Sequence, residues 1–213
     1  MDEDQTSARS PAARHLMQVA GRLFAERGTD GVTVRDIAEA AGLKNHAVVG
    51  YHFGSKEALI RALVIEGARL IDDRRNARLD QLEAGGGPNN LRQVVDVLIL
   101  PAVDLTGSAL EDSYSRFVVL LGMTHRNLFM SALEGRWNSG YQRCLEHLRR
   151  LMPDMPAALK TERLVFVGAY LGSVLAAREA ALADRSRDHP TWSAAGTLDH
   201  FARTMTALLD APA

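Results

Sequence analysis

Residues 33–42, Thr-Val-Arg-Asp-Ile-Ala-Glu-Ala-Ala-Gly, constrain the fold more than any other part of this sequence. Thr33 and Asp36 have the spacing of a capping box, in which a hydroxyl and a carboxylate bind free backbone amides at the start of a helix. Ile37 and Ala41 continue the helical spacing of apolar residues, and Gly42 stands where a left-handed residue ends a helix and lets the chain turn. A second short helix is expected to follow, so these residues predict a helix-turn-helix.

The second helix of this motif is expected at residues 45–53. Val49 and Phe53 lie four residues apart and share a face that can pack against the preceding helices. Asn45 and His46 lie at the amino end, where polar side chains and backbone amides can approach bases and phosphates. The opposite face carries Lys44, Ala47, Val48 and Tyr51. A recognition helix presents such a face to the major groove of DNA, although an ordinary corner between two helices has the same local spacing.

The rest of the chain predicts an all-α fold, because apolar residues recur at helical spacing and no run of β-branched residues is bounded by hairpin turns. Ser10 and Pro11 predict the start of a first helix, which Gly28 ends. Ser55 predicts the start of a long fourth helix, which runs to about Ala84 and connects two bodies. Further helices are expected at about 89–104, 109–123, 126–151, 157–184 and 191–209, which makes about nine in all.

Composition indicates a soluble globular protein. The chain has 213 residues and 46% hydrophobic content, which is enough for a substantial core. The longest near-continuous apolar run is identified at residues 94–103. It is shorter than the roughly 20 residues that cross a bilayer, so no membrane span is expected. The amino terminus, Met-Asp-Glu-Asp-Gln, is acidic and polar, so we expect no secretory signal and a cytoplasmic location.

The distribution of charge favours a local contact with nucleic acid. The net charge of the chain is −1, which argues against a general polyanion binder. Residues 9–56, however, contain seven basic side chains against four acidic ones. This local excess fits a small DNA-binding unit attached to a larger acidic domain, because phosphate neutralisation needs local rather than global positive charge.

The sequence offers no pattern for catalysis or metal binding. Cys144 is the one cysteine, so neither an intramolecular disulfide nor a cysteine zinc cluster is possible. The seven histidines show no metal-binding spacing, and neither a nucleophile elbow nor a phosphate loop occurs. We therefore expect no metal, no cofactor and no catalytic residues.

Four motifs, taken together and in order, resemble the amino-terminal domain of TetR-family transcriptional regulators. They are Leu-Phe-Ala-Glu-Arg-Gly at 23–28, Val-Thr-Val-Arg-Asp-Ile-Ala at 32–38, Ala-Gly-Leu at 41–43 and Tyr-His-Phe-Gly-Ser-Lys-Glu-Ala-Leu at 51–59. The resemblance implies a helix-turn-helix DNA-binding domain at residues 10–56, preceded by an arm at 1–9 that is expected to be disordered. It also implies a helical effector-binding and dimerisation domain at residues 57–213.

The resemblance also indicates which side chains touch DNA phosphates or bases, namely Thr33, Arg35, Tyr51, His52 and Lys56. Helix geometry adds Lys44, Asn45 and His46. For Arg35, an exposed salt bridge is the alternative role. The chain departs from the family pattern between Gly42 and Phe53, where it carries one residue more, and Val48 and Gly50 stand where Thr and Tyr are frequent. Gly50 either permits close backbone approach to DNA or simply weakens the helix, by about 1 kcal/mol relative to Ala.

A dimer follows from this mechanism, because twofold-related recognition helices about 34 Å apart read a palindrome in successive major grooves. The expected helix at 157–184 carries small residues at a spacing of four, and the last helix carries apolar residues on one side. The homodimer interface is predicted at Gly168, Gly172, Ala176, Ala180, Leu198, Phe201 and Met205. The alternative is that the small residues pack within their own subunit.

Aromatic residues in the middle of the chain form a candidate effector pocket. This set comprises Arg116, Phe117, Leu121, His125, Phe129, Trp137 and Tyr141. Arg116 and His125 are the titratable groups that could orient an effector, and core packing is the alternative for each residue of the set.

Taken together, the sequence predicts a dimeric repressor that binds a palindromic operator in double-stranded DNA and that a small apolar effector releases. The alternative is an architectural or partner-binding protein of the same fold that has no effector.

Overall fold

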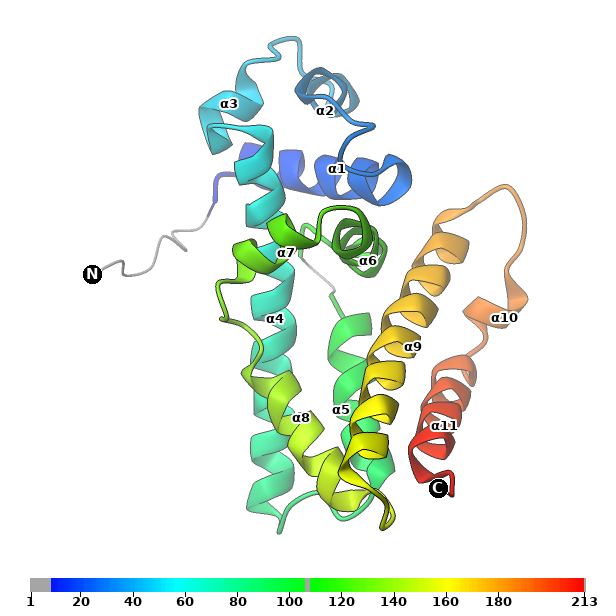
Figure 1. The fold of residues 1–213 in the computed structure, drawn as a ribbon. Coiled ribbons are helices and arrows are strands. Elements are labelled where there is room, and N and C mark those ends of the chain that lie inside the picture. Colours follow the sequence, from blue (N-terminus) through cyan, green and yellow to red (C-terminus); the bar gives the residue numbers. More distant parts are fainter. Residues whose placement is uncertain (1–8, 106–107, 213) are drawn as a thin grey trace.

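The computed structural model describes residues 9–105 and 108–212 (Figure 1). These residues form helices and no strand, which confirms the all-α prediction. The arm expected at residues 1–9 lies outside the described residues, apart from Arg9. The helices are α1 (Pro11–Arg27), α2 (Val34–Ala40), α3 (Val48–Phe53), α4 (Lys56–Ala84), α5 (Leu91–Val103), α6 (Tyr114–Thr124), α7 (Arg126–Leu133), α8 (Ser139–Leu151), α9 (Ala157–Ala183), α10 (Pro190–Ser193) and α11 (Thr197–Asp210).

Side-chain caps begin α1 and α4 where the sequence predicts them. The Ser10 hydroxyl accepts a hydrogen bond from the amide of Ala13 at 3.2 Å, and Pro11 occupies the first position of α1. The Ser55 hydroxyl accepts a hydrogen bond from the amide of Ala58 at 3.0 Å. Each cap satisfies an amide that has no partner within the first helical turn.

The described residues form eleven helices rather than about nine, because two of the expected helices are each divided. The helix expected at 126–151 is interrupted where Glu134, Gly135 and Trp137 adopt positive φ angles of 49°, 73° and 58°. Residues with positive φ cannot continue a right-handed helix. The helix expected at 191–209 is likewise divided into α10 and α11. The other expected helices differ from the observed ones only in where they begin or end.

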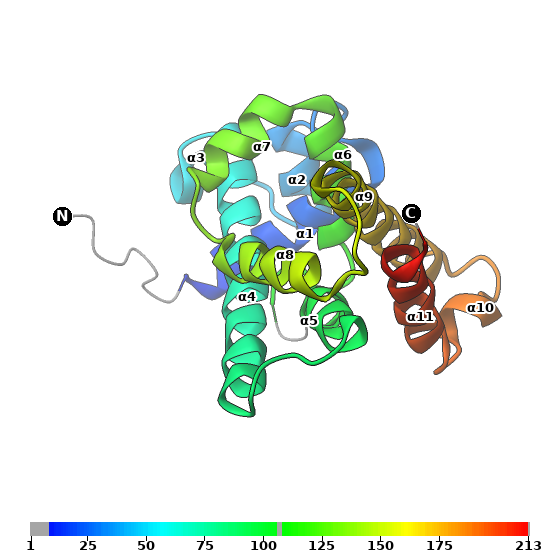
Figure 2. The ribbon, with the colours of Figure 1, turned by 60° about the horizontal axis from the view of Figure 1, so that its bottom comes forward.

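The first three helices form one end of the molecule, and α4 extends from them along the rest of the helical bundle (Figure 1). Helices α5 and α8 contact α4 and each other, while α6 packs on α1. Helices α9 and α11 pack together on the side away from α4, with α10 at the outer edge (Figure 2).

One hydrophobic core joins the first three helices to the larger bundle. Phe24 of α1 and Phe117 of α6 are buried and stack with their ring centroids 6.0 Å apart. Gly67 lets α4 approach α6 closely, because a Cβ there would lie 2.3 Å from the ring of Tyr114. The hydroxyl of Tyr114 donates a hydrogen bond to the carbonyl of Val64 at 2.9 Å. Helix α6 is therefore fixed to both α1 and α4.

The helix long and apolar enough for a membrane span is α9, which does not contain the apolar run at 94–103. Within the described residues, Ala157–Ala183 is the one helix long and apolar enough to cross a membrane, with a mean hydropathy of 1.4 over its best window. Only 28% of that window is buried. Length and composition alone do not establish a membrane span, because an apolar helix can equally be covered by another part of a protein.

Candidate DNA-binding site

Helix α2 is held at both ends by the interactions that the sequence predicts. The Thr33 hydroxyl accepts a hydrogen bond from the amide of Asp36 at 3.1 Å, and the Asp36 carboxylate accepts hydrogen bonds from the hydroxyl and the amide of Thr33, each at 2.7 Å. These hydrogen bonds hold the pKa of Asp36 below its usual range. At the other end Gly42 has a φ of +71°, and the amide of Leu43 donates to the carbonyl of Ala38 at 2.9 Å. The capping box and the glycine turn are therefore confirmed.

Helix α3 begins at Val48, three residues later than expected, since the sequence predicted a start at residue 45. The Asn45 side-chain oxygen accepts a hydrogen bond from the amide of Ala47 at 2.9 Å. This local bond forms a turn in place of a first helical turn, as Asn side chains commonly do. Lys44 and His46 lie in the same turn, and both are exposed.

The two faces of α3 differ as the sequence predicts for Val49, which is fully buried, Phe53, which is half-buried, and Tyr51, which is 85% exposed. Val48, expected on the outer face, is instead half-buried against the core. The rings of Tyr51 and His52 meet edge to face with centroids 4.9 Å apart. A Cβ at Gly50 would meet no atom within 4 Å, so no packing within the chain requires a glycine there.

Two of the predicted phosphate contacts already have partners within the protein. The Arg35 guanidinium donates to the carboxylate of Glu39 at 2.7 Å, which is the salt bridge given above as its alternative role. The Lys56 ammonium donates to the carbonyls of Thr29 and Val32 at 2.9 and 3.0 Å. Lys56 thus ties the start of α4 to the turn before α2, a role that has no signal in the sequence because it depends on how that turn folds back.

The comparison with known families covers the same helices. A sequence model of the family described as "Bacterial regulatory proteins, tetR family" matches residues 16–63, from α1 into α4. The amino-terminal part of the chain, from α1 into α4, is thus a TetR-family domain.

The chain is similar to curated repressors over this amino-terminal part. It is 46% identical over 57 residues to the HTH-type transcriptional repressor KstR2 of Rhodococcus jostii, which is 27% of this chain and 28% of that relative. The chain thus covers under a third of the length of the curated relatives that it matches first.

Solved structures share the fold over nearly the whole chain. PfmR, a TetR family transcriptional regulator from Thermus thermophilus, has a TM-score of 0.59 at 16% identity and covers 93% of this chain and 99% of its own. AibR, solved with isovaleryl coenzyme A and operator DNA, has a TM-score of 0.60 at 17% identity, with 95% and 100% covered. At these identities the likeness shows that the chains share a fold, and nothing more.

Both ends of α6 are anchored by contacts that the sequence analysis did not predict. At its carboxyl end, His125 Nε2 lies 2.9 Å from a carboxylate oxygen of Asp30, in the turn between α1 and α2. At its amino end, the Glu179 carboxylate of α9 accepts hydrogen bonds from the amides of Ser115 and Arg116 at 2.9 and 2.8 Å. Burial raises the pKa of Glu179 in spite of these bonds. Helix α6 therefore joins α9 to the DNA-binding domain.

The candidate effector residues do not gather in one place. Phe117 packs against α1 and His125 binds Asp30, so both face the first domain. Tyr141 of α8 instead lies against α4, with its ring 5.6 Å from Cζ of Arg75. Among the remaining candidates Leu121 is buried, Arg116, Phe129 and Trp137 are half-buried, and some polar nitrogens of Arg116 and Trp137 are buried without hydrogen-bond partners in the described residues.

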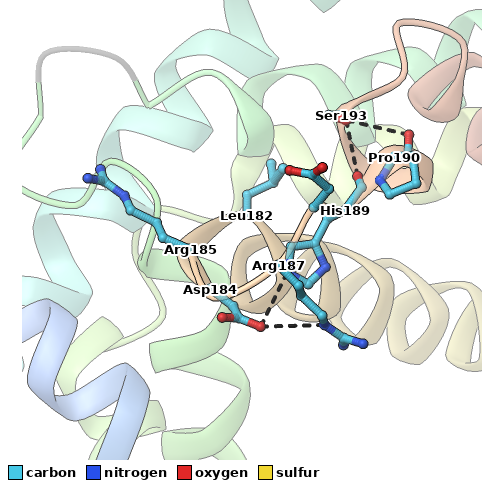
Figure 3. Close-up of a pocket in the computed structure, with 8 residues that line it drawn as sticks. Leu182, Asp184, Arg185, Arg187, His189, Pro190 and Ser193 are labelled. Atoms are coloured by element: carbon cyan, nitrogen blue, oxygen red, sulfur yellow. Dashed lines mark hydrogen bonds and ion pairs between the residues drawn. The ribbon is translucent and has the colours of Figure 1, made fainter.

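A surface hollow of about 560 Å³ lies elsewhere, at the connection from α9 to α10 (Figure 3). There the carboxylate of Asp184 lies 3.3 Å from His189 Nε2 and 3.6 Å from Arg187 Nε. The other lining residues are Leu182, Arg185, Asp188, Pro190 and Ser193. No residue of the predicted effector set contributes to this hollow.

Two of the small residues of α9 that are predicted at the dimer interface lie close to side chains of their own subunit. A Cβ at Gly168 would lie 3.0 Å from the hydroxyl of Tyr141, and one at Gly172 would lie 3.2 Å from a methyl of Val119. Ala176, Ala180 and Leu198 are half-buried, and Phe201 and Met205 are buried. The side of α9 that faces away from the subunit carries different residues: Val165, Phe166, Ala169, Ser173 and Ala177.

Proposed function

We propose that this chain is a homodimeric transcriptional repressor that binds a palindromic operator and leaves it when a small effector binds. The observation that carries the proposal is the exposed face of α3 and of the turn before it, presented by a capped α2 in the domain that the TetR family sequence model matches. A repressor of this kind works at the chromosome, and hence in the bacterial cytoplasm.

Sequence readout is proposed for the turn that precedes α3. Asn45 uses its side-chain oxygen to hold the amide of Ala47, which leaves its NH2 group to donate to a base or a phosphate. Lys44 and His46 are exposed on either side of it and supply further donors. Tyr51 and His52 are proposed to support binding by contacts to the DNA backbone.

Thr33, Arg35 and Lys56 are proposed as weaker contributors. The hydroxyl of Thr33 is bound to Asp36, and Arg35 and Lys56 have partners of their own, so each would exchange a protein partner for a phosphate. Such an exchange gains less free energy than a contact made by a side chain without a partner.

Two copies are proposed to meet through α9 and α11. On the outer side of α9, Val165 is 63% exposed and Phe166 is 57% exposed, and small residues continue the same face. A contiguous exposed apolar surface of this kind marks an interaction site. A second copy of the chain would bury it, which also accounts for the apolar character of α9 without a membrane.

Effector release is proposed to act through α6, which is bonded to α9 at one end and to the turn before α2 at the other. An effector that favours a different position of α6 would shift the population away from the form that binds DNA. The structural neighbour AibR was solved with isovaleryl coenzyme A and operator DNA, which supports a ligand-responsive version of this fold. An effector-independent DNA-bound protein remains the second candidate, because the predicted effector residues are spread over two regions.

The decisive test is selection of binding sequences by the purified full chain from genomic fragments, including the promoter of its own gene. We expect enrichment of palindromes whose half-sites lie about 34 Å apart, and dimers in solution. Failure to enrich any sequence above a random pool would reject the proposal.

A variant pair then assigns the readout. His46→Ala should lower affinity for the selected operator by about 1–3 kcal/mol at one base position while leaving binding to random DNA unchanged. Asn127→Ala, at an exposed residue of α7 outside the first three helices and the proposed dimer interface, is the control and should bind both DNAs as the wild type does. Equal loss on both DNAs for His46→Ala would show that His46 contacts the backbone rather than a base.

A further inference from the structure

A half-buried arginine whose Nε is inaccessible to solvent lies in the larger domain, where α4, α5 and α8 meet. Nη2 of Arg75, on α4, donates a hydrogen bond to the carbonyl of Leu98 on α5 at 3.0 Å. Its guanidinium carbon lies 5.6 Å from the centroid of the Tyr141 ring on α8. Tyr141 and Arg75 are both half-buried, so part of their surface stays accessible.

The bonding of this guanidinium is incomplete. Its Nε is inaccessible to solvent and has no hydrogen-bond partner in the described residues. Among the described residues, no carboxylate oxygen lies within 4.0 Å of a nitrogen of the Arg75 guanidinium. Burial lowers the pKa of Arg75, as expected for a cation withdrawn from water without a bound anion.

The nearest candidate for a counter-charge on the same helix is already engaged. The buried carboxylate of Asp72 accepts hydrogen bonds from the Ser139 hydroxyl at 2.9 Å and from the amide of Gly140 at 2.8 Å. A Cβ at Gly140 would lie 2.7 Å from the Cβ of Arg75, so α8 approaches α4 closely here. Asp72 thus fixes the start of α8 and leaves the charge of Arg75 without a direct partner.

We propose that Arg75 binds the carboxylate of a small apolar acid, and that this acid is the effector. Arg75 has the planar fork of N–H donors that carboxylates match in pairs, and it is always charged under physiological conditions. The side chains around it are Tyr141, Tyr114, Cys144 and Asp72, and the Asp72 carboxylate is engaged by Ser139 and Gly140. A neutral ligand would leave the buried charge unpaired, whereas a carboxylate would pair with it.

The role of the acid as an effector rests on the proposed function, because it requires that acid binding changes the affinity of the protein for DNA. Helix α4 begins at Lys56, directly after α3, and its far part carries Arg75. An acid bound between α4, α5 and α8 would favour one arrangement of α4 over another, and α6 would follow, because Tyr114 of α6 bonds the carbonyl of Val64 on α4. Binding of the acid itself needs no DNA and is tested apart from it.

The experiment measures the Tm of the full chain at pH 7 with acetate, butyrate, hexanoate and benzoate, each against its own amide. We expect at least one acid to raise the Tm, by about 3–6 °C at ten times its dissociation constant, while its amide does not. No acid raising the Tm above its amide would overturn the proposal.

Two variants locate the effect. Arg75→Gln should abolish the difference between the acid and its amide, and Arg78→Gln, at an exposed arginine on the same helix, should keep it. A difference that persists in Arg75→Gln places the acid elsewhere and refutes the assignment. If Arg75→Gln does not fold, Arg75→Lys replaces it and should lower the affinity for the acid at least tenfold, because the fork is lost while the charge remains.

The acid that raises the Tm is then added to the complex of wild-type protein and selected operator. Release of DNA supports its role as effector. A Tm increase without any change in DNA binding would keep the acid site but refute its role as the effector. If the chain selects no operator at all, the acid site stands on the Tm measurements while the proposed function falls.

Discussion

Val49→Ala is expected to loosen α3 selectively, because Val49 is its one fully buried residue. Helix α3 has six residues, no side-chain cap and a glycine at Gly50, so it has little stability of its own. Truncating a valine with no exposed surface removes two methyl groups, at about 0.8 kcal/mol each, and leaves a cavity. The sum is about 2 kcal/mol of lost docking free energy, which corresponds to an opening equilibrium of α3 roughly 30-fold larger.

Hydrogen exchange followed by mass spectrometry measures this opening directly. Peptides that cover residues 48–53 should exchange about 30-fold faster in Val49→Ala, while peptides from the core of α9 keep the wild-type rate. Val48→Ala is the matched control: this neighbour is half-buried, so its truncation should raise the exchange rate of the same peptides by only a few-fold. Unchanged exchange in α3, or an equal increase throughout the chain, would refute the idea that Val49 holds α3 in place.

Three further predictions concern the same domain. Gly50→Ala should slow hydrogen exchange in α3, because a Cβ there meets open space and Ala favours a helix by about 1 kcal/mol over Gly. If Gly50→Ala nevertheless binds the operator more weakly, Gly50 lets the backbone approach DNA; unchanged binding would show that it does not. Asp30→Ala removes the contact with His125. The Asp30 side chain is 81% exposed and that of His125 is 34% exposed, so thermal denaturation should show that the free energy of unfolding falls by less than about 1 kcal/mol, while hydrogen exchange in the turn before α2 becomes faster. A much larger fall in the free energy of unfolding would contradict a linking role. The pKa of Asp36 lies below its ordinary value of 3.8, so its ionised form stabilises α2 above that pH, and this contribution is lost as the pH falls through the lowered pKa. Circular dichroism should therefore show that the difference in helix content between the wild type and Asp36→Asn shrinks as the pH falls from 7 to 2. A difference that stays constant would argue against the capping carboxylate.

Sequence reasoning succeeded for interactions that join residues three or four positions apart. Thr33 with Asp36, and Ser55 with the amide of Ala58, close within a single helical turn, so their spacing is enough to predict them. The glycine turn at Gly42 succeeded for the same reason, because a positive φ is a local property of one residue. Asn45 shows the limit of this reasoning: its side chain bonds locally to an amide and delays the start of α3.

Long-range partners could not be predicted in this way. His125 was a candidate effector contact, but its partner Asp30 lies 95 positions earlier in the chain. Glu179 binds amides 63 and 64 positions away, and nothing near it in the sequence indicates a helix start as its partner. Gly168 shows the same limit: its spacing indicates a close contact but not whether the contact is with its own subunit or with a second copy.

The sequence by itself determined the helical class, the capped helix-turn-helix and the family, because each depends on periodicity or on bonds between near neighbours. Only the tertiary structure decided which side chains the turn before α3 exposes and which helix joins α9 to the DNA-binding domain. It also decided that no carboxylate of the described residues lies within 4.0 Å of the Arg75 guanidinium. These depend on the angles and distances at which helices cross, and those follow from packing the whole core at once rather than from any single segment.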